Sequence, residues 1–301
     1  MRIVVTGREG QVVRSLIERA SGETQIVPVG RPELNLGGPG DAIISTIASA
    51  RPDVIVSAAA FTQVDKAERE PEIAFAVNED GPRAVAIAAR QCGVPLIHIS
   101  TDYVFDGTKD CPYVEEDLTR PTSVYGASKL AGEQAVLAEH GNAAVLRTAW
   151  VYSPFGKNFV KTMLRLAGDR DEIGVVADQR GNPTSALDIA DGVLAVAGNL
   201  CRSNEPAHRG IFHMAAAGEA SWAEFAEAIF RASAEDGGPS ARVKHIRTSD
   251  YPTAAIRPAS SRLDSRKLER THGVRLPDWH SSVKHVVSRL LQPAASGEFD
   301  L

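Results

Sequence analysis

Hydrophobic and polar positions follow a repeating two-part pattern along the first half of the chain. Short, nearly continuous apolar runs rich in β-branched residues alternate with longer stretches whose apolar residues recur at helical spacing. This pattern predicts parallel βαβ units with helices on both faces of one sheet. The expected strands span residues 2–7, 25–30, 52–59, 95–102 and 143–150. The expected helices span residues 11–20, 40–50, 72–92 and 124–140.

The alternation loosens after about residue 150, where Gly and Pro clusters interrupt the pattern. Right-handed crossovers between the earlier strands predict an α/β fold with a doubly wound parallel sheet, a Rossmann fold, followed by a smaller C-terminal lobe. We expect residues 1–152 to form the sheet domain, with 183–215 returning to it. Residues 153–182 and 216–301 would then form the smaller lobe.

Composition and charge exclude several classes of protein. The net charge of −5, with no local Lys/Arg cluster, gives no reason to expect nucleic acid as a partner. No run reaches the roughly 18 apolar residues of a membrane span, and the chain opens directly into a strand, so we expect a cytoplasmic protein without a membrane partner. Three distant cysteines and eight scattered histidines lack the spacing of a metal site, and we expect no metal held by the protein.

A glycine-containing turn joins the first expected strand to the first expected helix. Gly7 and Gly10 would let the backbone approach a pyrophosphate, which the N–H groups of Gln11 and Val12 at the helix start would then face. Val13 stands where a third glycine is usual, and we expect it to push the helix outward slightly. The turn indicates dinucleotide binding by residues 1–152, leaving the smaller lobe to bind substrate. Taken alone, it is also compatible with an ordinary tight turn.

The second expected strand ends without the acidic residue that often binds the ribose hydroxyls of NAD. Gly30 stands at that place and Arg31 follows it. A guanidinium forks well onto phosphate oxygens, so Arg31 favours NADPH over NADH through its 2′-phosphate. The alternative is a solvated surface arginine.

Tyr125 and Lys129 are four residues apart at the start of an expected helix, which places both side chains on one helix face. They follow a strand that carries Thr101 at its carboxyl end, where ligands of such sheets bind. A ketone that accepts hydride needs a proton donor, and an ammonium beside a tyrosine lowers the phenol pKa toward neutrality. Thr101 would polarise the same carbonyl oxygen. We therefore expect these three residues to be catalytic. The alternative is that Tyr125 only packs and Lys129 is solvated.

Two longer segments make the chemistry more specific. Residues 100–107 read STDYVFDG and residues 125–133 read YGASKLAGE. Together they resemble the dTDP-4-dehydrorhamnose reductase family of the extended short-chain dehydrogenases. Further matches run through most of the chain and include residues 58–68 (AAAFTQVDKAE), 147–152 (RTAWVY) and 178–184 (DQRGNPT).

The resemblance implies an NADPH- or NADH-dependent oxidoreductase that reduces C4 of dTDP-4-dehydro-L-rhamnose to dTDP-L-rhamnose, for surface polysaccharide synthesis. It gives Thr101, Tyr125 and Lys129 the roles argued above, with Tyr125 and Lys129 also touching the cofactor. It places further residues around the cofactor: Gly7, Gly10, Gln11, Val12, Ala58, Ala59, Ala60 and Thr62. It places others near the sugar nucleotide: Val104, Phe105, Trp150 and Asn158. Trp150 is equally compatible with a core position.

Three departures from the family pattern lie on the cofactor side, namely Val13, Ser57 and Gly30. Some members of the family form a homodimer around Mg²⁺, but no residue here identifies those ligands. Alternatives remain open on the same scaffold: an epimerase or dehydratase that retains NAD, or a reductase of another nucleotide-linked 4-keto-6-deoxy sugar. A non-catalytic, dinucleotide-binding regulatory subunit, like the family relatives that partner methionine adenosyltransferase, is a third.

Overall fold

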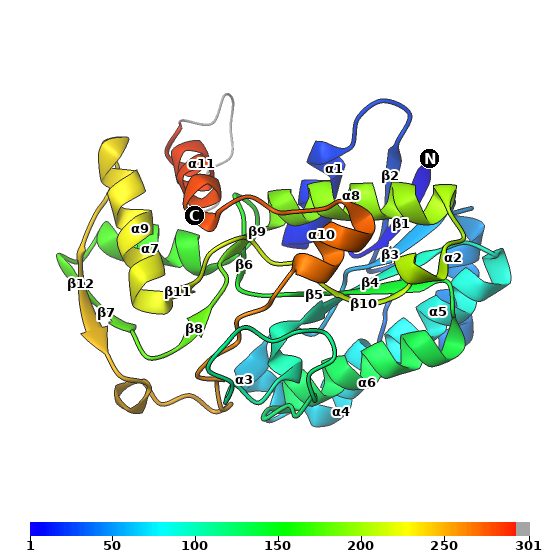
Figure 1. Ribbon diagram of the computed structural model, residues 1–301, viewed down its shortest axis with the longest axis horizontal. Helices are drawn as coiled ribbons and strands as arrows, with labels where there is room; N and C mark the ends of the chain where they lie inside the picture. The colour runs from blue at the N-terminus through cyan, green and yellow to red at the C-terminus, as the bar shows by residue number, and fades with distance from the viewer. Residues whose placement is uncertain (293–301) are drawn as a thin grey trace.

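The computed structural model describes residues 1–292, in which a six-stranded parallel sheet forms the larger of two lobes (Figure 1). The strand order is β10-β5-β4-β3-β1-β2. This confirms the expected doubly wound fold, because the order reverses beside β1 and helices cover both faces. The strands are β1 (Arg2–Thr6), β2 (Gln25–Val29), β3 (Val54–Ser57), β4 (Leu96–Thr101), β5 (Ala143–Thr148) and β10 (Gly210–His213).

Two layers of helices enclose this sheet. On one face α1 packs against α8, and on the other α5 packs against both α2 and α6. Apolar residues of β1, β3 and β5, together with Leu96 and Ile97 of β4, are completely buried between the layers, as expected for strands covered on both faces. The helices of the sheet domain are α1 (Gln11–Arg19), α2 (Gly40–Ser49), α3 (Val64–Ala67), α4 (Pro71–Phe75), α5 (Gly81–Cys92), α6 (Val124–Glu139), α8 (Ala186–Arg202) and α10 (Arg266–His272).

The helix expected over 72–92 is divided. A π-helical segment, Ala76–Asp80, separates α4 from α5. Asn78 lies within it, completely buried, and its amide bonds both the backbone of Phe61 and the hydroxyl of Ser128. The wider turn thus lets one side chain join the loop after β3 to helix α6, a connection that apolar periodicity does not reveal.

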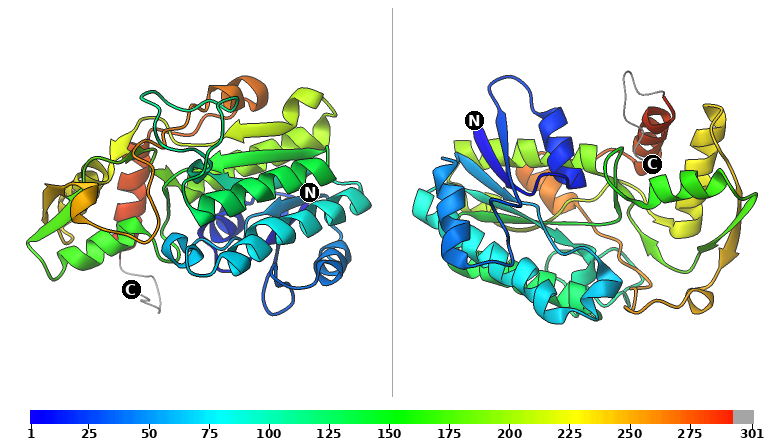
Figure 2. Two further views of the ribbon diagram at one scale, coloured as in Figure 1. Left: turned by 90° about the horizontal axis from the view of Figure 1, so that it is seen from below. Right: turned by 180° about the vertical axis from the view of Figure 1, so that it is seen from behind.

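The smaller lobe is built around a second apolar core and lies beside the carboxyl ends of the sheet strands, as the views in Figure 2 also show. Helix α9 begins at a capping box between Ser221 and Glu224. The remaining strands and helices are β6 (Val151–Tyr152), α7 (Phe159–Ala167), β7 (Glu172–Val176), β8 (Arg180–Gly181), β9 (Thr184–Ser185), β11 (Ala220–Ser221), α9 (Trp222–Glu235), β12 (Arg242–Ile246) and α11 (Trp279–Leu291), with a 3-10 turn at Thr248–Asp250. Two further 3-10 turns, Asp102–Val104 after β4 and Pro206–His208 before β10, belong to the sheet domain.

The chain crosses between the lobes more than once. After the first crossing it returns through α8 and β10, and β10 pairs with β5 in parallel at the edge of the main sheet. Residues 293–301, the end of the lobe expected over 216–301, lie outside the described residues. Within residues 1–292, no helix is long and apolar enough to cross a membrane.

Candidate active site

The turn between β1 and α1 has the geometry of a phosphate cradle. Gly7 has φ +99°, a value that side chains rarely allow, and α1 starts after Gly10 without any side-chain cap. The first N–H groups of the helix are therefore left for an anionic ligand. Val13, whose effect on this helix we expected to be outward, is almost completely buried in the core of the sheet domain.

A cleft of about 870 Å³ opens beside this turn and runs along the loops after β2 and β3. Part of the expected cofactor set lines it: Gly7, Arg31, Ala59, Ala60 and Thr62. Others stand outside its lining: Gly10, Gln11, Val12, Ala58, Tyr125 and Lys129. A cleft lined by glycines, next to a helix whose first N–H groups have no side-chain cap, fits a dinucleotide. The nicotinamide end of that dinucleotide would continue toward the carboxyl end of β4.

Arg8 also lines the cleft and was missed by the sequence analysis. A Cβ atom on Gly30 would lie 3.1 Å from Cγ of Arg8 and 3.2 Å from the carbonyl carbon of Gly7. An acidic residue at position 30 would therefore crowd the phosphate turn, which explains its absence. Arg8 forms an exposed ion pair with Glu33 at 2.7 Å.

Thr101 and Tyr125 meet where β4 ends and α6 begins. Ser123 caps α6 by accepting a hydrogen bond from the N–H of Gly126, which fixes the first turn of that helix. The side chains of Thr101 and Tyr125 come together there, since Thr101 acts to lower the pKa of Tyr125, and the ring of Tyr125 packs edge-on against Tyr103 at 5.6 Å between centroids. Burial raises the pKa of Tyr125 to about 12, although the Thr101 contact lowers it.

That direction is opposite to the one expected from a neighbouring ammonium, because burial dominates the pKa of the phenol and no opposing effect comes from Lys129. Its Nζ atom donates to the carbonyl of Ile99 at 2.7 Å and lies 3.4 Å from Nε2 of His98. The ammonium is thus engaged with β4. Burial lowers the pKa of Lys129 to about 8, while Glu133 one helical turn later opposes that shift.

Asp102 is a further ionisable group at this site that sequence reasoning did not single out. The Thr101 hydroxyl donates to its Oδ1 atom at 3.0 Å, and its side chain is buried. Burial raises the pKa of Asp102 to about 6, with hydrogen bonds from Ser261 and Thr101 acting against that shift. The sequence could have identified Asp102 as a site residue, because it directly follows Thr101 at the carboxyl end of an expected strand, where ligands of such sheets bind.

The four residues expected near the sugar nucleotide divide into three environments. Val104 and Phe105 are completely buried in an apolar cluster, so their side chains support the crevice wall from within instead of facing a ligand. Trp150 has φ +45°, uncommon for a bulky residue, and stacks on Trp222 at 3.6 Å between centroids. A strained backbone at such a place is typical of functional positions.

Asn158, the fourth, connects the smaller lobe to the phosphate turn. Its Nδ2 atom donates to Oε1 of Gln11 at 3.1 Å and to the carbonyl of Ser153 at 2.8 Å. The hydroxyl of Ser153 donates to the same Gln11 oxygen at 2.9 Å. Gln11, expected beside the cofactor, therefore ties the start of α1 to the segment that leads into α7.

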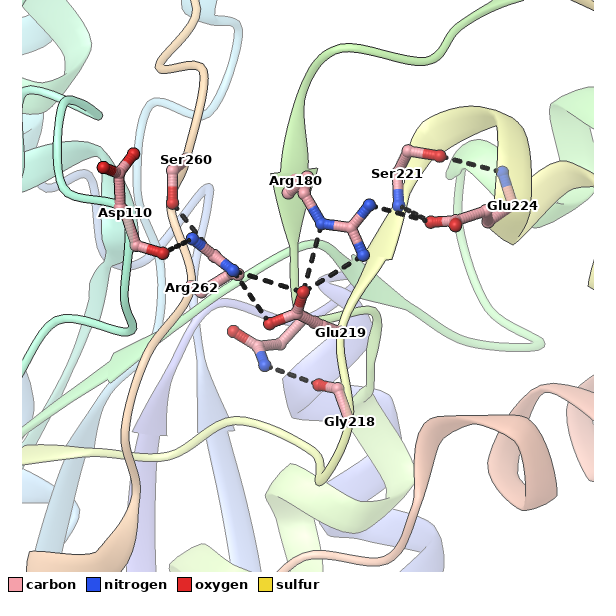
Figure 3. Close-up of polar contacts among 9 residues, drawn as sticks. Asp110, Arg180, Gly218, Glu219, Ser221, Glu224, Ser260 and Arg262 are labelled. Carbon is pink, nitrogen blue, oxygen red and sulfur yellow. Dashed lines mark hydrogen bonds and ion pairs between the residues drawn. The ribbon is translucent and has the colours of Figure 1, made fainter.

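A second charged network lies at the junction of the lobes (Figure 3). Glu219 accepts from Arg180 on β8 and from Arg262, and Arg262 also donates to the carbonyl of Asp110. Arg180 additionally pairs with Glu224 at 3.4 Å. These contacts join the loop after β4 to the smaller lobe. Within residues 1–292, no group of three or more His, Cys, Asp or Glu side chains is placed to hold a metal ion.

Comparison with known proteins places this geometry in context. Residues 1–292 match the family model described as RmlD substrate binding domain. The chain is 52% identical to the dTDP-4-dehydrorhamnose reductase of Sinorhizobium fredii, over 97% of this chain and 98% of that protein. Among solved structures, the dTDP-4-dehydrorhamnose reductase of Clostridium acetobutylicum superposes with a TM-score of 0.89 at 36% identity, covering 96% of this chain and 99% of that one. That of Bacillus anthracis, solved in complex with NADP, gives 0.87 at 35% identity, covering 95% and 98%.

Proposed function

The chain belongs to the dTDP-4-dehydrorhamnose reductase family, and on that premise we propose that it reduces the C4 keto group of dTDP-4-dehydro-L-rhamnose to give dTDP-L-rhamnose. It is an oxidoreductase that uses NADPH or NADH, and its product serves surface polysaccharide synthesis. The observation that carries the proposal is that Thr101 at the carboxyl end of β4 and Tyr125 in the first turn of α6 come together, in a chain whose relatives are named for this reaction.

The bound nicotinamide supplies the hydride. As the C4 oxygen gains negative charge, the phenol of Tyr125 donates its proton to that oxygen, and the Thr101 hydroxyl stabilises the developing charge. Tyr125 is well suited to hold a proton until that moment, because burial keeps its pKa near 12. Lys129 has one N–H beyond its two contacts with β4, and we assign that N–H to the nicotinamide ribose.

The remaining residues divide between the lobes. We propose that residues 1–152 with 183–215 bind the dinucleotide through Gly7, Gly10, Gln11, Val12 and the segment 58–62. Residues 153–182 and the described part of 216–301, apart from α10, which packs on the sheet domain, would bind the sugar nucleotide. The strained, stacked position of Trp150 supports its assignment to the substrate. Asn158 would affect the site indirectly, by holding the side chain of Gln11. Val104 and Phe105 would do so by packing behind the residues that face the substrate.

Arg31 is assigned to the 2′-phosphate of NADPH, supported by its place in the lining of the cleft. Replacing it with Ala is expected to weaken NADP⁺ binding by about 1–3 kcal/mol and to leave NAD⁺ binding unchanged. Titration of both nucleotides by calorimetry measures this, with Arg209→Ala, an arginine away from the cleft, as the control. Equal effects on both nucleotides would show that Arg31 does not recognise the 2′-phosphate and is a solvated surface arginine.

The decisive experiment follows NADPH oxidation with enzymatically made dTDP-4-dehydrorhamnose, beside GDP- and UDP-linked 4-keto sugars. We expect turnover only with the dTDP sugar, because binding of the nucleotide orients the reacting carbonyl. Preference for another nucleotide-linked 4-keto-6-deoxy sugar would make the chain a sister reductase. No turnover with any of them, together with tight dinucleotide binding, would favour a regulatory subunit.

The proposal also includes the setting of the reaction. We place it in the cytoplasm, where its nucleotide-sugar substrate and NADPH are made, and we expect a homodimer. Size-exclusion chromatography with light scattering, with and without Mg²⁺, tests the second point. A monomer under both conditions would contradict it.

A further inference from the structure

His98 is a buried ionisable residue to which the proposed mechanism gives no role. It lies in β4, three residues before Thr101, and is completely inaccessible to solvent. Burial, and the nearby ammonium of Lys129, both hold the pKa of His98 well below its usual range, so its imidazole is neutral at pH 7.

The contact between the two side chains fixes the tautomer of that imidazole. An ammonium has no acceptor, so Nε2 of His98 must accept from Lys129 across their 3.4 Å contact. The ring proton then sits on Nδ1, which has no partner among the described residues. An unsatisfied buried N–H destabilises the fold, and an apolar residue would avoid it. The histidine is therefore better explained by its contact with Lys129.

A buried carboxylate supports the same lysine from the other side. Glu133 follows Lys129 by four residues, as Lys129 follows Tyr125, so the three side chains share one face of α6. Its carboxylate accepts two hydrogen bonds from Nε and Nη2 of Arg147 on β5, at 2.9 and 2.7 Å, and one from Ser100 at 2.5 Å. Glu133 is thus held rigidly one helical turn after Lys129, and its charge acts to raise the pKa of Lys129.

We propose that His98 and Glu133 are positioning residues for Lys129: His98, with the Ile99 carbonyl, aims the ammonium, and Glu133 supplies the counter-charge that keeps it charged in a buried place. The inference rests on the proposed function only in assigning Lys129 to the cofactor ribose. The other ionisable groups on the elements around this site are Tyr125 on the same helix, Arg147 on β5, and Asp102 and Tyr103 in the turn after β4. The π-helical segment contributes the buried, neutral Asn78, whereas its two acidic residues, Glu79 and Asp80, are not buried.

Removing the acceptor should make the charged lysine less stable. In His98→Leu we expect the pKa of Lys129 to fall below its value of about 8, by about 0.5–1 unit, since hydrogen bonds to a charged form favour that form. In His98→Gln an amide oxygen can accept in place of Nε2, and we expect most of that shift to be reversed.

The test measures NADP⁺ affinity from pH 6 to 9.5 by calorimetry, in parallel with the pH profile of kcat/KM for NADPH. In the unchanged protein, binding should weaken as Lys129 loses its proton near pH 8. Lys129→Met should abolish this limb, which would assign the limb to the lysine. His140→Leu, which alters another buried histidine that bonds the Val94 carbonyl, is the matched control and should leave the midpoint unmoved.

A folded His98→Leu protein with an unshifted midpoint would overturn the proposal, as would equal shifts in the Leu and Gln variants. If the Leu variant is unfolded by circular dichroism, His98→Met replaces it, because its thioether fills similar space and accepts hydrogen bonds only weakly. A chain that shows the shifted limb but reduces no nucleotide sugar would contradict the proposed function and leave this inference standing.

Discussion

Two charged networks in this protein use the same residue types in opposite surroundings. Between α6 and β5, Arg147 and Glu133 pair at 2% and 1% exposure of their side chains. At the junction of the lobes, Arg180 and Glu219 pair at 39% and 38% exposure. Water and salt screen the second pair and leave the first almost unscreened.

The difference in burial determines how strongly each ion pair affects the stability and reactivity of this protein. A buried pair is costly to form and costly to break, since removal of one partner strands the other without water. An exposed pair exchanges contacts with solvent at little cost. We therefore expect the buried network to govern reactivity and stability, and the junction network to adjust only how the lobes meet.

The largest expected effect concerns Tyr125, which lies on the same helix as the buried Glu133. Tyr125→Phe keeps the ring and its packing on Tyr103 but deletes the proposed proton donor, so kcat should fall by about 10²–10⁴-fold. NADP⁺ affinity and the melting temperature should stay close to their original values, which controls for damage to the fold. Near-normal turnover of the folded variant would assign proton donation to another group.

Arg147→Met tests the cost of breaking the buried pair. It leaves the Glu133 carboxylate without its guanidinium, so the free energy of unfolding measured in urea should fall by about 3–5 kcal/mol. The double variant Arg147→Met with Glu133→Leu replaces both charges by apolar side chains and should recover much of that loss. If the double variant were less stable than the single one, the ion pair itself would be the stabilising element.

Asp102 shows the consequence of a buried carboxylate without an ion-pair partner. The pKa of Asp102 is about 6 in the folded chain and about 4 in the unfolded chain. The contribution of Asp102 to stability is therefore greatest in acid and is lost as the pH rises through 6. We expect the free energy of unfolding of the original protein to fall when the pH is raised from 5 to 7.5. In Asp102→Asn that fall should be smaller by about 1–2 kcal/mol. Parallel stability curves for the two proteins would argue that Asp102 is ionised throughout.

The smallest effect belongs to the junction. Glu219→Gln removes the acceptor shared by Arg180 and Arg262, yet we expect a change below about 1 kcal/mol in unfolding free energy, and a smaller one in 0.5 M salt. A loss comparable to that of Arg147→Met would mean that the lobes fold as one unit through this contact.

The sequence predicted the sheet domain well because its signals are local. Strands buried on both faces read as continuous apolar runs, and the expected 95–102 and 143–150 contain β4 and β5. The pairing of Tyr125 with Thr101 followed from two general rules, helical spacing and the carboxyl ends of parallel strands.

What the sequence could not supply depends on distant neighbours. Nothing local distinguishes Val104 and Phe105, completely buried, from residues that face a ligand. The lysine was expected to lower the pKa of Tyr125, but burial of the phenol gives the opposite direction. Glu133 could have been found by extending the four-residue spacing by one turn, whereas His98 requires knowing which face of β4 lies under α6.

The return of the chain to the main sheet through β10 has a consequence for synthesis on the ribosome. β5 ends at Thr148 and its outer neighbour begins only at Gly210, so at about 5–20 residues per second the outer edge of β5 waits roughly 3–12 s for its partner. During that interval a strand that is buried along its whole length in the finished protein presents unpaired backbone N–H and C=O groups. Nascent chains of this enzyme should therefore be most prone to aggregate, and most dependent on chaperones, while the smaller lobe is being started.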